Sequence, residues 1–202
     1  MADVLASLES GKKFDLDVPG LDYKVPLPYV VLKEGGREIK IASLNMVGQI
    51  GLNEDLGALL AGKIRSQIPD LDGVVILTVV EKALQVTQVA ARHLGINTVA
   101  VAYNRIKPHM ESLRRPTIQV GADSITSGGK YLALYERDIN LICRAKKGVI
   151  LIDDVVSTGG TIFGLATLVE EAARLKNMPA VPHLLGVFCV AQEGGLPPLL
   201  PA

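Results

Sequence analysis

The sequence has no tryptophan, and aromatic residues make up only 4% of its 202 positions. It has two cysteines, Cys143 and Cys189, which are too few for a disulfide-rich scaffold and are not spaced as metal ligands. Lys plus Arg and Asp plus Glu both number 21, so the chain lacks the basic excess that is typical of nucleic-acid-binding proteins. These absences argue against a secreted disulfide scaffold and against a protein that binds nucleic acid.

Long hydrophobic runs are also missing. No apolar run approaches the roughly 18 residues of a membrane-spanning helix, because Thr78, Glu81 and Asp153 interrupt the longest candidates. The N-terminal Met-Ala-Asp-Val lacks the basic-then-apolar order of a signal peptide. Hydrophobic residues nevertheless account for 49% of the chain, which is ample for a buried core. We therefore expect a soluble, cytoplasmic protein with one α/β domain and a small appendage, which binds neither membranes nor nucleic acid.

The N-terminal part of the chain carries a hairpin signal. Its first twenty residues are polar and mixed, which predicts a weakly ordered lead-in. Residues 23–33 and 37–44 are rich in Val, Ile and Tyr and flank a Gly-Gly pair, which predicts two antiparallel strands. Asn53 is expected to cap a helix over 54–67.

Strand and helix signals alternate through the rest of the chain. Continuous apolar runs predict strands that are covered on both faces at 74–80, 98–103, 149–152 and 184–190. Apolar residues at helical spacing predict helices over 82–94, before Gly95, and over 161–175. Such alternation predicts a mostly parallel sheet with helices on both faces.

One connection is unusually long. Residues 104–129 are polar and contain several Pro and Gly residues. Because ordinary connections are much shorter, we expect a functional loop with a partial hairpin inside it.

The most informative stretch joins the strand at 149–152 to the following helix. Asp153 and Asp154 come directly after the apolar run, and a turn of small residues, 157–161 (Ser-Thr-Gly-Gly-Thr), precedes the helix. Ligands of open α/β sheets bind beyond the carboxyl ends of the strands, and hydroxyls, backbone N–H groups and the positive end of a helix together cradle a phosphate. Two acids beside a phosphate would repel it unless they bind vicinal sugar hydroxyls or Mg²⁺. The stretch therefore predicts a ligand with a phosphate, a ribose-like diol and magnesium.

A simpler interpretation is that the acid pair only ends a strand and that the turn is an ordinary loop. The Thr-Gly-Gly-Thr string directly before a helix makes this interpretation the weaker one. A Walker-type phosphate loop is excluded, since no Gly-x-x-x-x-Gly-Lys-Ser/Thr string occurs.

Residues 149–161 resemble the 5-phosphoribosyl-1-pyrophosphate (PRPP) motif of type I phosphoribosyltransferases, and the likeness extends over most of 45–195. It is closest to adenine phosphoribosyltransferase-like purine enzymes. The resemblance implies an α/β fold with a mostly parallel central sheet, flanking helices and a small hood. It implies a lead-in, hairpin and hood contribution over 1–50, a phosphoribosyltransferase core over 51–195 and a tail over 196–202.

The same resemblance implies an enzyme of the glycosyltransferase class that acts in purine salvage. Such an enzyme joins a purine base, here preferably adenine, to the ribose of PRPP with Mg²⁺ and releases pyrophosphate. Members of the family commonly form homodimers, so the resemblance also implies a homodimer.

Site residues follow from the resemblance, position by position. Asp153 and Asp154 would bind the ribose hydroxyls as catalytic residues and would hold the metal directly or through water. The residues implied to bind PRPP are Asp153, Asp154, Val155, Val156, Ser157, Thr158, Gly159, Gly160 and Thr161. The residues implied to bind pyrophosphate are Glu81, Lys82, Ala83, Arg105 and Lys107, of which Lys107 is also counted as catalytic. A cation at the leaving group helps most as its negative charge grows.

Two departures from the family pattern concern the base. Enzymes for 6-oxopurines carry an extra acid where this chain has Ser157, which argues against hypoxanthine and guanine. Many adenine enzymes carry a glutamate in the mobile loop where this chain has Thr126. A xanthine-type phosphoribosyltransferase and a non-catalytic PRPP-binding regulator of purine metabolism therefore stay open. Tyr23, Tyr29 and Phe188 are candidates for the base pocket, with core packing as the equal alternative.

Overall fold

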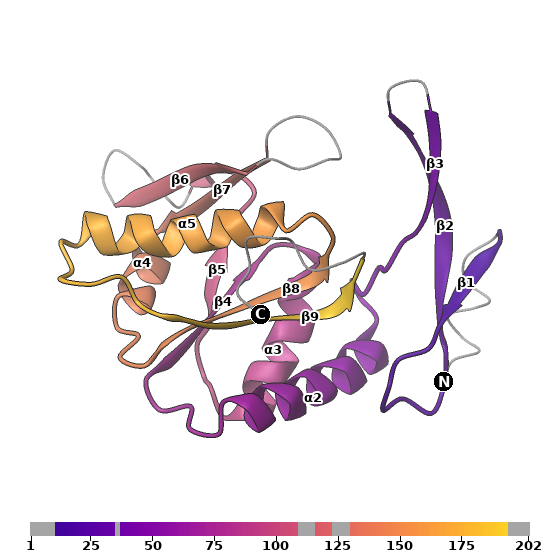
Figure 1. Ribbon diagram of the computed structural model, residues 1–202, viewed down its shortest axis with the longest axis horizontal. Helices are drawn as coiled ribbons and strands as arrows, with labels where there is room; N and C mark the ends of the chain where they lie inside the picture. Colours follow the sequence, from indigo (N-terminus) through magenta and orange to yellow (C-terminus); the bar gives the residue numbers. More distant parts are fainter. Residues whose placement is uncertain (1–10, 35–36, 109–115, 123–129, 194–202) are drawn as a thin grey trace.

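A parallel sheet forms the centre of the computed structural model, which describes residues 11–34, 37–108, 116–122 and 130–193 (Figure 1). Its strands are β4 (Val74–Val79), β5 (Ala100–Ala102), β8 (Gly148–Val156) and β9 (Leu184–Gln192). Their order in the sheet is β5-β4-β8-β9, and each neighbouring pair is parallel. All residues of β4 are buried, as expected for a strand with both faces covered. The predicted parallel sheet is confirmed.

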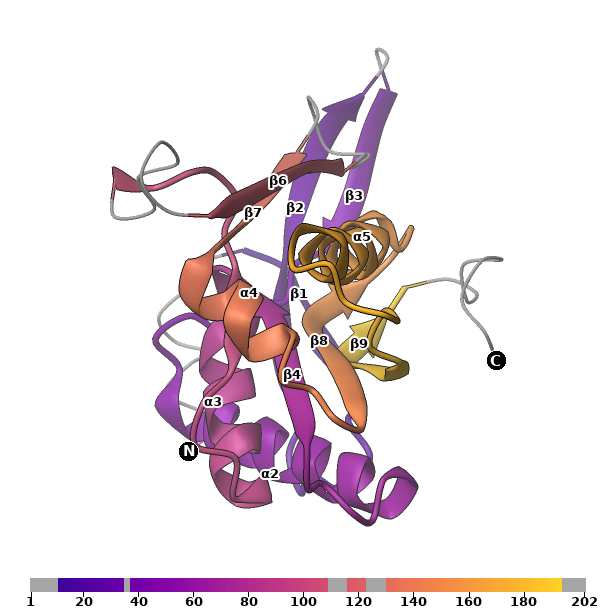
Figure 2. The ribbon, with the colours of Figure 1, turned by 90° about the vertical axis from the view of Figure 1, so that its left-hand side faces the viewer.

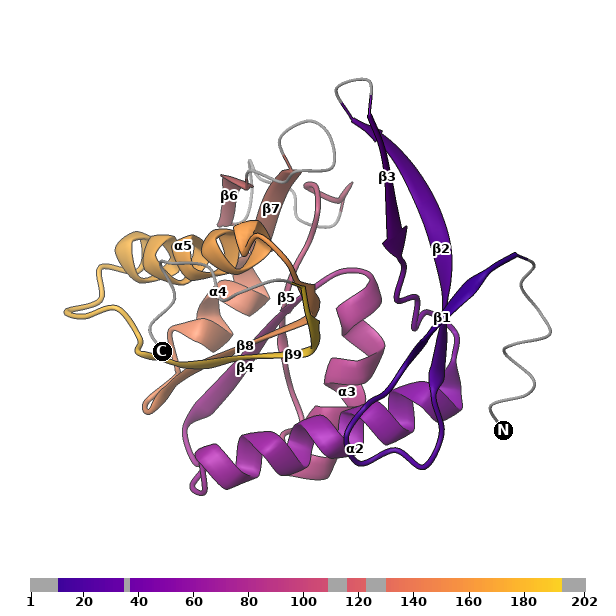
Figure 3. The same ribbon diagram turned by 45° about the vertical axis from the view of Figure 1, so that its right-hand side comes forward.

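Helices cover both faces of this sheet, as Figures 1 and 3 show. The helices are α2 (Ile50–Gln67), α3 (Lys82–Leu94), α4 (Glu136–Ile142) and α5 (Gly160–Leu175). Val75 and Leu77 of β4 pack with α4 and α5, whereas Val74 and Ile76 pack with α2 and α3. Because side chains alternate along a strand, this strand contributes to a separate apolar core on each face. No helix in the described ranges is long and apolar enough to cross a bilayer.

A second, antiparallel sheet lies at the N-terminal end (Figure 3), and its Val25 and Leu27 are buried in the core on the α2–α3 face. It contains β1 (Lys13–Leu16), β2 (Val25–Glu34) and β3 (Arg37–Ala42) in the order β1-β2-β3. The pairing of β2 with β3 confirms the predicted hairpin. The lead-in prediction is wrong for Lys13–Leu16, because these residues pair with the Val25–Pro28 part of β2, a long-range contact that local composition does not reveal.

The helix prediction around Asn53 is also wrong in its start. The helix begins at Ile50, so Asn53 lies inside it and is 2% exposed. Its Nδ2 donates to the carbonyl oxygens of Met46 at 2.6 Å and Gln49 at 2.8 Å. The Asn53 amide thus donates to carbonyl oxygens of the segment that precedes the helix, and it does not cap the first helical N–H groups.

The long connection contains the expected hairpin, formed by β6 (Thr117–Ala122) and β7 (Lys130–Tyr135). The hairpin lies along α5 (Figure 2), and its apolar side chains join the core on that face. Tyr103 and Ala133 exchange two backbone hydrogen bonds, of 2.8 and 2.7 Å, which attach the end of β5 to β7. Helix α4, which no sequence pattern had indicated, follows β7 directly.

Candidate active site

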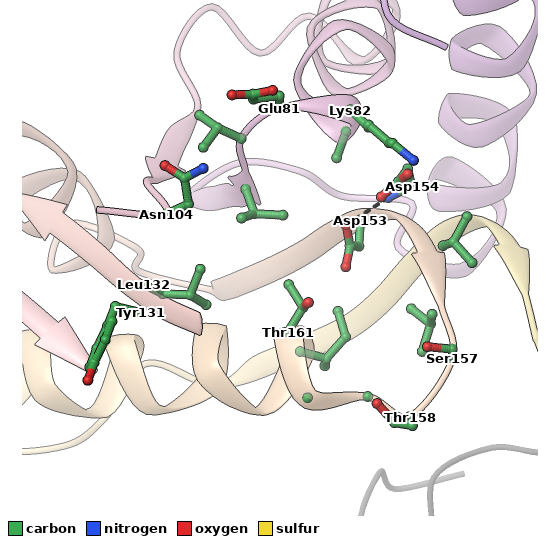
Figure 4. Close-up of a pocket in the computed structure, with 18 residues that line it drawn as sticks. Glu81, Lys82, Asn104, Tyr131, Leu132, Asp153, Asp154, Ser157, Thr158 and Thr161 are labelled. Carbon is green, nitrogen blue, oxygen red and sulfur yellow. Dashed lines mark hydrogen bonds between the residues drawn. The ribbon is translucent and has the colours of Figure 1, made fainter. Parts of the chain in front are cut away.

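A cavity of about 390 Å³ opens at the carboxyl ends of β4 and β8 (Figure 4). Its described lining consists of residues 79–83, Asn104, 131–132 and 153–162. The fold therefore brings Glu81, Lys82 and Ala83 to the same cavity as the 153–161 stretch, although some seventy positions separate them in sequence. This is the edge of the sheet at which open α/β proteins bind their ligands.

The acid pair lies within β8 and not after it. The strand runs to Val156 because β9 continues alongside, with Asp153 opposite Cys189. Asp153 is 4% exposed, and its Oδ1 accepts a hydrogen bond of 2.9 Å from the backbone N–H of Asp154. Asp154 is less buried. The sequence-based strand over 149–152 was thus too short, and the paired strand holds both carboxylates in a fixed backbone.

The turn that follows is built for close approach to an anion. Gly159 has φ of +80°, in the left-handed region that glycine adopts without strain, and the helix α5 begins directly after it. The N-cap residue of α5 is Gly159 itself, which has no side chain, so no N-cap side chain covers the first N–H groups of the helix. The hydroxyl-bearing residues Ser157 and Thr158 are exposed beside them. Backbone donors, hydroxyls and the positive helix end therefore converge on one side of the cavity.

The opposite wall carries a cation. Lys82 begins α3, and its Nζ donates to the carbonyl oxygen of Leu44 at 3.2 Å. Figure 4 shows the side chains of Lys82 and Asp154 extending toward each other, while the carboxylate of Glu81 points away from the acid pair. The peptide bond between Val80 and Glu81 is cis. The described lining of the cavity thus has three carboxylates and one ammonium group.

Two predicted cations do not reach the cavity. Among the described lining residues neither Arg105 nor Lys107 is present, although the preceding Asn104 is. Sequence reasoning missed Asn104, Tyr131 and Leu132. The pairing of Tyr103 with Ala133 places these residues at the cavity, and no local sequence pattern predicts that bridge. Thr126 and its neighbours in the long loop lie outside the described residues.

None of the three aromatic candidates lines this cavity within the described chain. Phe188 is 6% exposed and belongs to the core on the α2–α3 face. The Tyr23 hydroxyl donates to Asp55 at 2.7 Å, and burial together with this carboxylate raises the pKa of Tyr23 to about 12. Tyr29 lies on the hairpin, where the ammonium of Lys40 is 4.0 Å from its ring centre.

A thiol lies next to the acid pair. Burial raises the pKa of Cys189, and the nearby carboxylates of Asp153 and Asp154 act in the same direction. The neutral thiol is a poor nucleophile, so we expect Cys189 to react slowly at neutral pH.

Comparison with known proteins gives a result only at the level of structure. No family model matches the sequence, and no curated protein matches it. An adenine phosphoribosyltransferase from Thermoanaerobacter pseudethanolicus superimposes with a TM-score of 0.50 at 15% identity, covering 82% of this chain and 95% of that one. The chain has the fold of that phosphoribosyltransferase.

Two further structures are similar to lesser degrees. A Giardia lamblia APRTase complexed with 9-deazaadenine has a TM-score of 0.49 at 17% identity and covers 83% of this chain and 94% of that one. An orotate phosphoribosyltransferase from Aeropyrum pernix has a TM-score of 0.37 at 16% identity, with 81% and 85% covered. The superposition on the Thermoanaerobacter structure, together with the sheet topology, confirms the α/β fold expected from the sequence.

Proposed function

We propose that this protein is a phosphoribosyltransferase that moves the phosphoribosyl group of PRPP to a purine base and releases pyrophosphate. One observation carries the proposal: the acid pair, the uncapped start of α5 and Lys82 line a single cavity. Each part of PRPP has a partner there. Asp153 and Asp154 suit the ribose diol, the turn at Ser157–Thr161 suits the 5-phosphate, and the Lys82 ammonium suits the pyrophosphate.

The same arrangement favours the reaction over simple binding. When the bond between C1 and the pyrophosphate oxygen breaks, positive charge grows on the ribose and negative charge on the leaving group. Carboxylates at the ribose and an ammonium group at the pyrophosphate therefore bind the transition state more strongly than the ground state. Arg105 and Lys107 follow Asn104, which lines the cavity. We assign both to the leaving group, with the segment after β5 moving inward when PRPP binds.

Magnesium fits this donor set as a metal that arrives with its substrate. The described residues contain no group of three or more His, Cys, Asp or Glu side chains that could hold a metal alone. Mg²⁺ is often bound by one or two carboxylates and takes its other ligands from phosphate and water. Asp153 and Asp154 would hold it, directly or through water, and the metal would neutralise charge on the pyrophosphate.

The base has a candidate position next to the hood. A second cavity of about 260 Å³ lies between the hairpin and α2; its lining includes Pro26, Pro28, Leu44 and Gln49. Leu44 accepts the hydrogen bond of Lys82, so this bond joins the linings of the two cavities. A purine in the second cavity would lie beside the ribose in the first. We assign adenine as the preferred base, since Ser157 replaces the acid of 6-oxopurine enzymes, and keep xanthine as the alternative.

The decisive experiment measures pyrophosphate release from PRPP and Mg²⁺ with adenine, hypoxanthine, guanine, xanthine and orotate in separate reactions. We expect release with adenine, and a loss of at least about 100-fold in Asp153→Asn/Asp154→Asn. Asp70→Asn is the matched control, because Asp70 is an exposed aspartate that pairs with Lys147 away from the cavity. Release with none of the bases, while PRPP still raises the melting temperature, contradicts the enzyme and favours a PRPP-binding regulator. The homodimer is tested separately by sedimentation.

A further inference from the structure

Two hydroxyl groups lie in the apolar core, on β4 and α3, whose residues Val79, Lys82 and Ala83 line the cavity. Thr78 of β4 and Thr87 of α3 are both 0% exposed. Every other residue of β4 is Val, Ile or Leu. A buried hydroxyl costs free energy unless it is hydrogen-bonded, and valine has nearly the same shape without that cost. Packing alone therefore does not explain threonine at these two positions.

The two hydroxyls form one chain of hydrogen bonds. The Oγ1 of Thr87 donates to the Oγ1 of Thr78 at 3.0 Å. The Oγ1 of Thr78 in turn donates to the carbonyl oxygen of Ile152 at 3.0 Å. That carbonyl belongs to the peptide unit that joins Ile152 to Asp153. The chain thus runs from helix α3, across β4, to the peptide that carries the first catalytic carboxylate.

Each end of this hydrogen-bond chain lies in an element that lines the cavity. Lys82 and Ala83 of α3 line one wall, and Thr87 lies one helical turn after Ala83 on the same face. Asp153 and Asp154 line the other wall, and the Asp153 carboxylate is itself held by the Asp154 N–H. The threonine hydroxyls are therefore a direct polar link between the pyrophosphate wall and the ribose wall.

The position of the link along the sheet is informative. The backbone pairing of β4 with β8 ends at the pair formed by Thr78 and Ile152. β4 ends one residue later, at Val79, which lines the cavity, so no further pair of this ladder fixes the spacing of the two strands. The Thr78 side chain adds its hydrogen bond at that last pair, where it controls the spacing most directly.

We propose that Thr78 and Thr87 are positioning residues, which hold the start of α3 in register with the Asp153–Asp154 pair. This inference rests on the proposed function, because PRPP contacts both walls at once and its reacting bond lies between them. Neither threonine touches the substrate. Their hydroxyls act through Ile152 and through the first turns of α3, and a small displacement of either wall lowers the rate.

The test uses Thr78→Val and Thr87→Val, which delete the hydroxyls and keep the shape of the side chains. We expect melting temperatures close to wild type, a higher KM for PRPP, a lower kcat, and kcat/KM reduced roughly ten-fold in each variant. The double variant should lose no more kcat/KM than the more impaired single variant, since both substitutions break the same chain of hydrogen bonds. The matched control is Thr167→Val, whose hydroxyl donates to Phe163 on the exposed side of α5. This control should leave the kinetics unchanged.

Thr78→Ser and Thr87→Ser keep the hydroxyls and remove only a methyl group, so they separate positioning from packing even if the valine variants do not fold. We expect both serine variants to keep near wild-type KM and kcat. Serine variants as impaired as the valine variants would overturn the inference in favour of packing. Valine variants with wild-type kinetics would overturn it while the proposed function stands. A wild-type chain that releases no pyrophosphate and binds no PRPP would instead refute the proposed function.

Discussion

Asp138 offers a quantitative test of how the edge of the central sheet is held. Its side chain is 0% exposed, and its Oδ1 accepts hydrogen bonds from the backbone N–H of Val101 at 3.1 Å and from Arg137 at 2.6 Å. In Asp138→Ala the buried N–H of Val101 has no acceptor, which costs about 1–3 kcal/mol. The ion pair adds at most about 1 kcal/mol, because the Arg137 side chain is 49% exposed. We expect a loss of about 2–3 kcal/mol at neutral pH.

Asp138→Asn separates the hydrogen bond from the charge. The amide oxygen still accepts from Val101, and no buried charge remains, so this variant should lose less than about 1 kcal/mol. Within the described chain the Oδ2 of Asp138 has no hydrogen-bond partner, so the charge is incompletely compensated. Urea unfolding at constant m-value measures both variants. Equal losses in the alanine and asparagine variants would refute the reasoning, because the charge and not the acceptor would then dominate.

The pH dependence of this difference has a defined sign. Burial raises the pKa of Asp138, and the hydrogen bond from Arg137 opposes this only in part. A carboxyl whose pKa rises on folding contributes stability that is complete below its unfolded pKa of about 3.9 and is lost as the pH rises through the folded pKa. The free energy of unfolding of the wild type should therefore fall relative to Asp138→Asn as the pH rises from about 4. If the free energy of unfolding of the wild type instead rises relative to Asp138→Asn over this range, the interaction with Arg137 outweighs the desolvation of the carboxylate.

Two further predictions concern a glycine and the thiols. Gly148→Ala should lose about 3 kcal/mol, since its φ is +148° and a Cβ would lie 2.5 Å from the carbonyl oxygen of His183. In contrast Gly62→Ala, with open space around its Cβ and a helical backbone, should gain up to about 1 kcal/mol; thermal unfolding of both variants checks the pair. Burial raises the pKa of both Cys143 and Cys189, so both thiols should react slowly with Ellman's reagent at neutral pH and faster as the pH rises. Rapid labelling of two thiols per folded chain at neutral pH would contradict this.

The parts of the fold that the sequence predicted are those in which local pattern and tertiary environment agree. The apolar run at Val74–Val79 is buried on both faces of the sheet. Helix α3 ends before Gly95, whose φ of +77° suits glycine, as the 82–94 pattern required. The turn at Ser157–Gly159 leads directly into α5, whose first residues are Gly160 and Thr161, because its residue types suit a tight turn before a helix. In each case a short stretch contains the whole physical reason for its structure.

The parts that were missed depend on contacts between distant segments. Strand β1 exists because Lys13–Leu16 finds a partner in β2, and α4 begins where β7 ends. Leu132 and Asn104 reach the cavity through the Tyr103–Ala133 bridge. The sequence shows which segments are able to form strands, but which strands pair depends on the tertiary structure.

The two halves of the proposed site differ in how firmly the fold holds them. The ribose and phosphate groups would contact the ends of β4 and β8, whose strands pair with each other and lie between two layers of helices. The base would contact a cavity whose lining includes the half-buried Pro26 and Pro28, which alternate along β2 with the buried core residues Val25 and Leu27. Substitutions of Pro26 and Pro28, which are only half-buried, therefore disturb less of the central packing than changes at the strand ends, which alter residues such as Asp153 that are buried and hydrogen-bonded. On the proposed function, we therefore expect that the choice of base can change within this fold while the binding of PRPP is retained, and that the hood mainly sets base specificity.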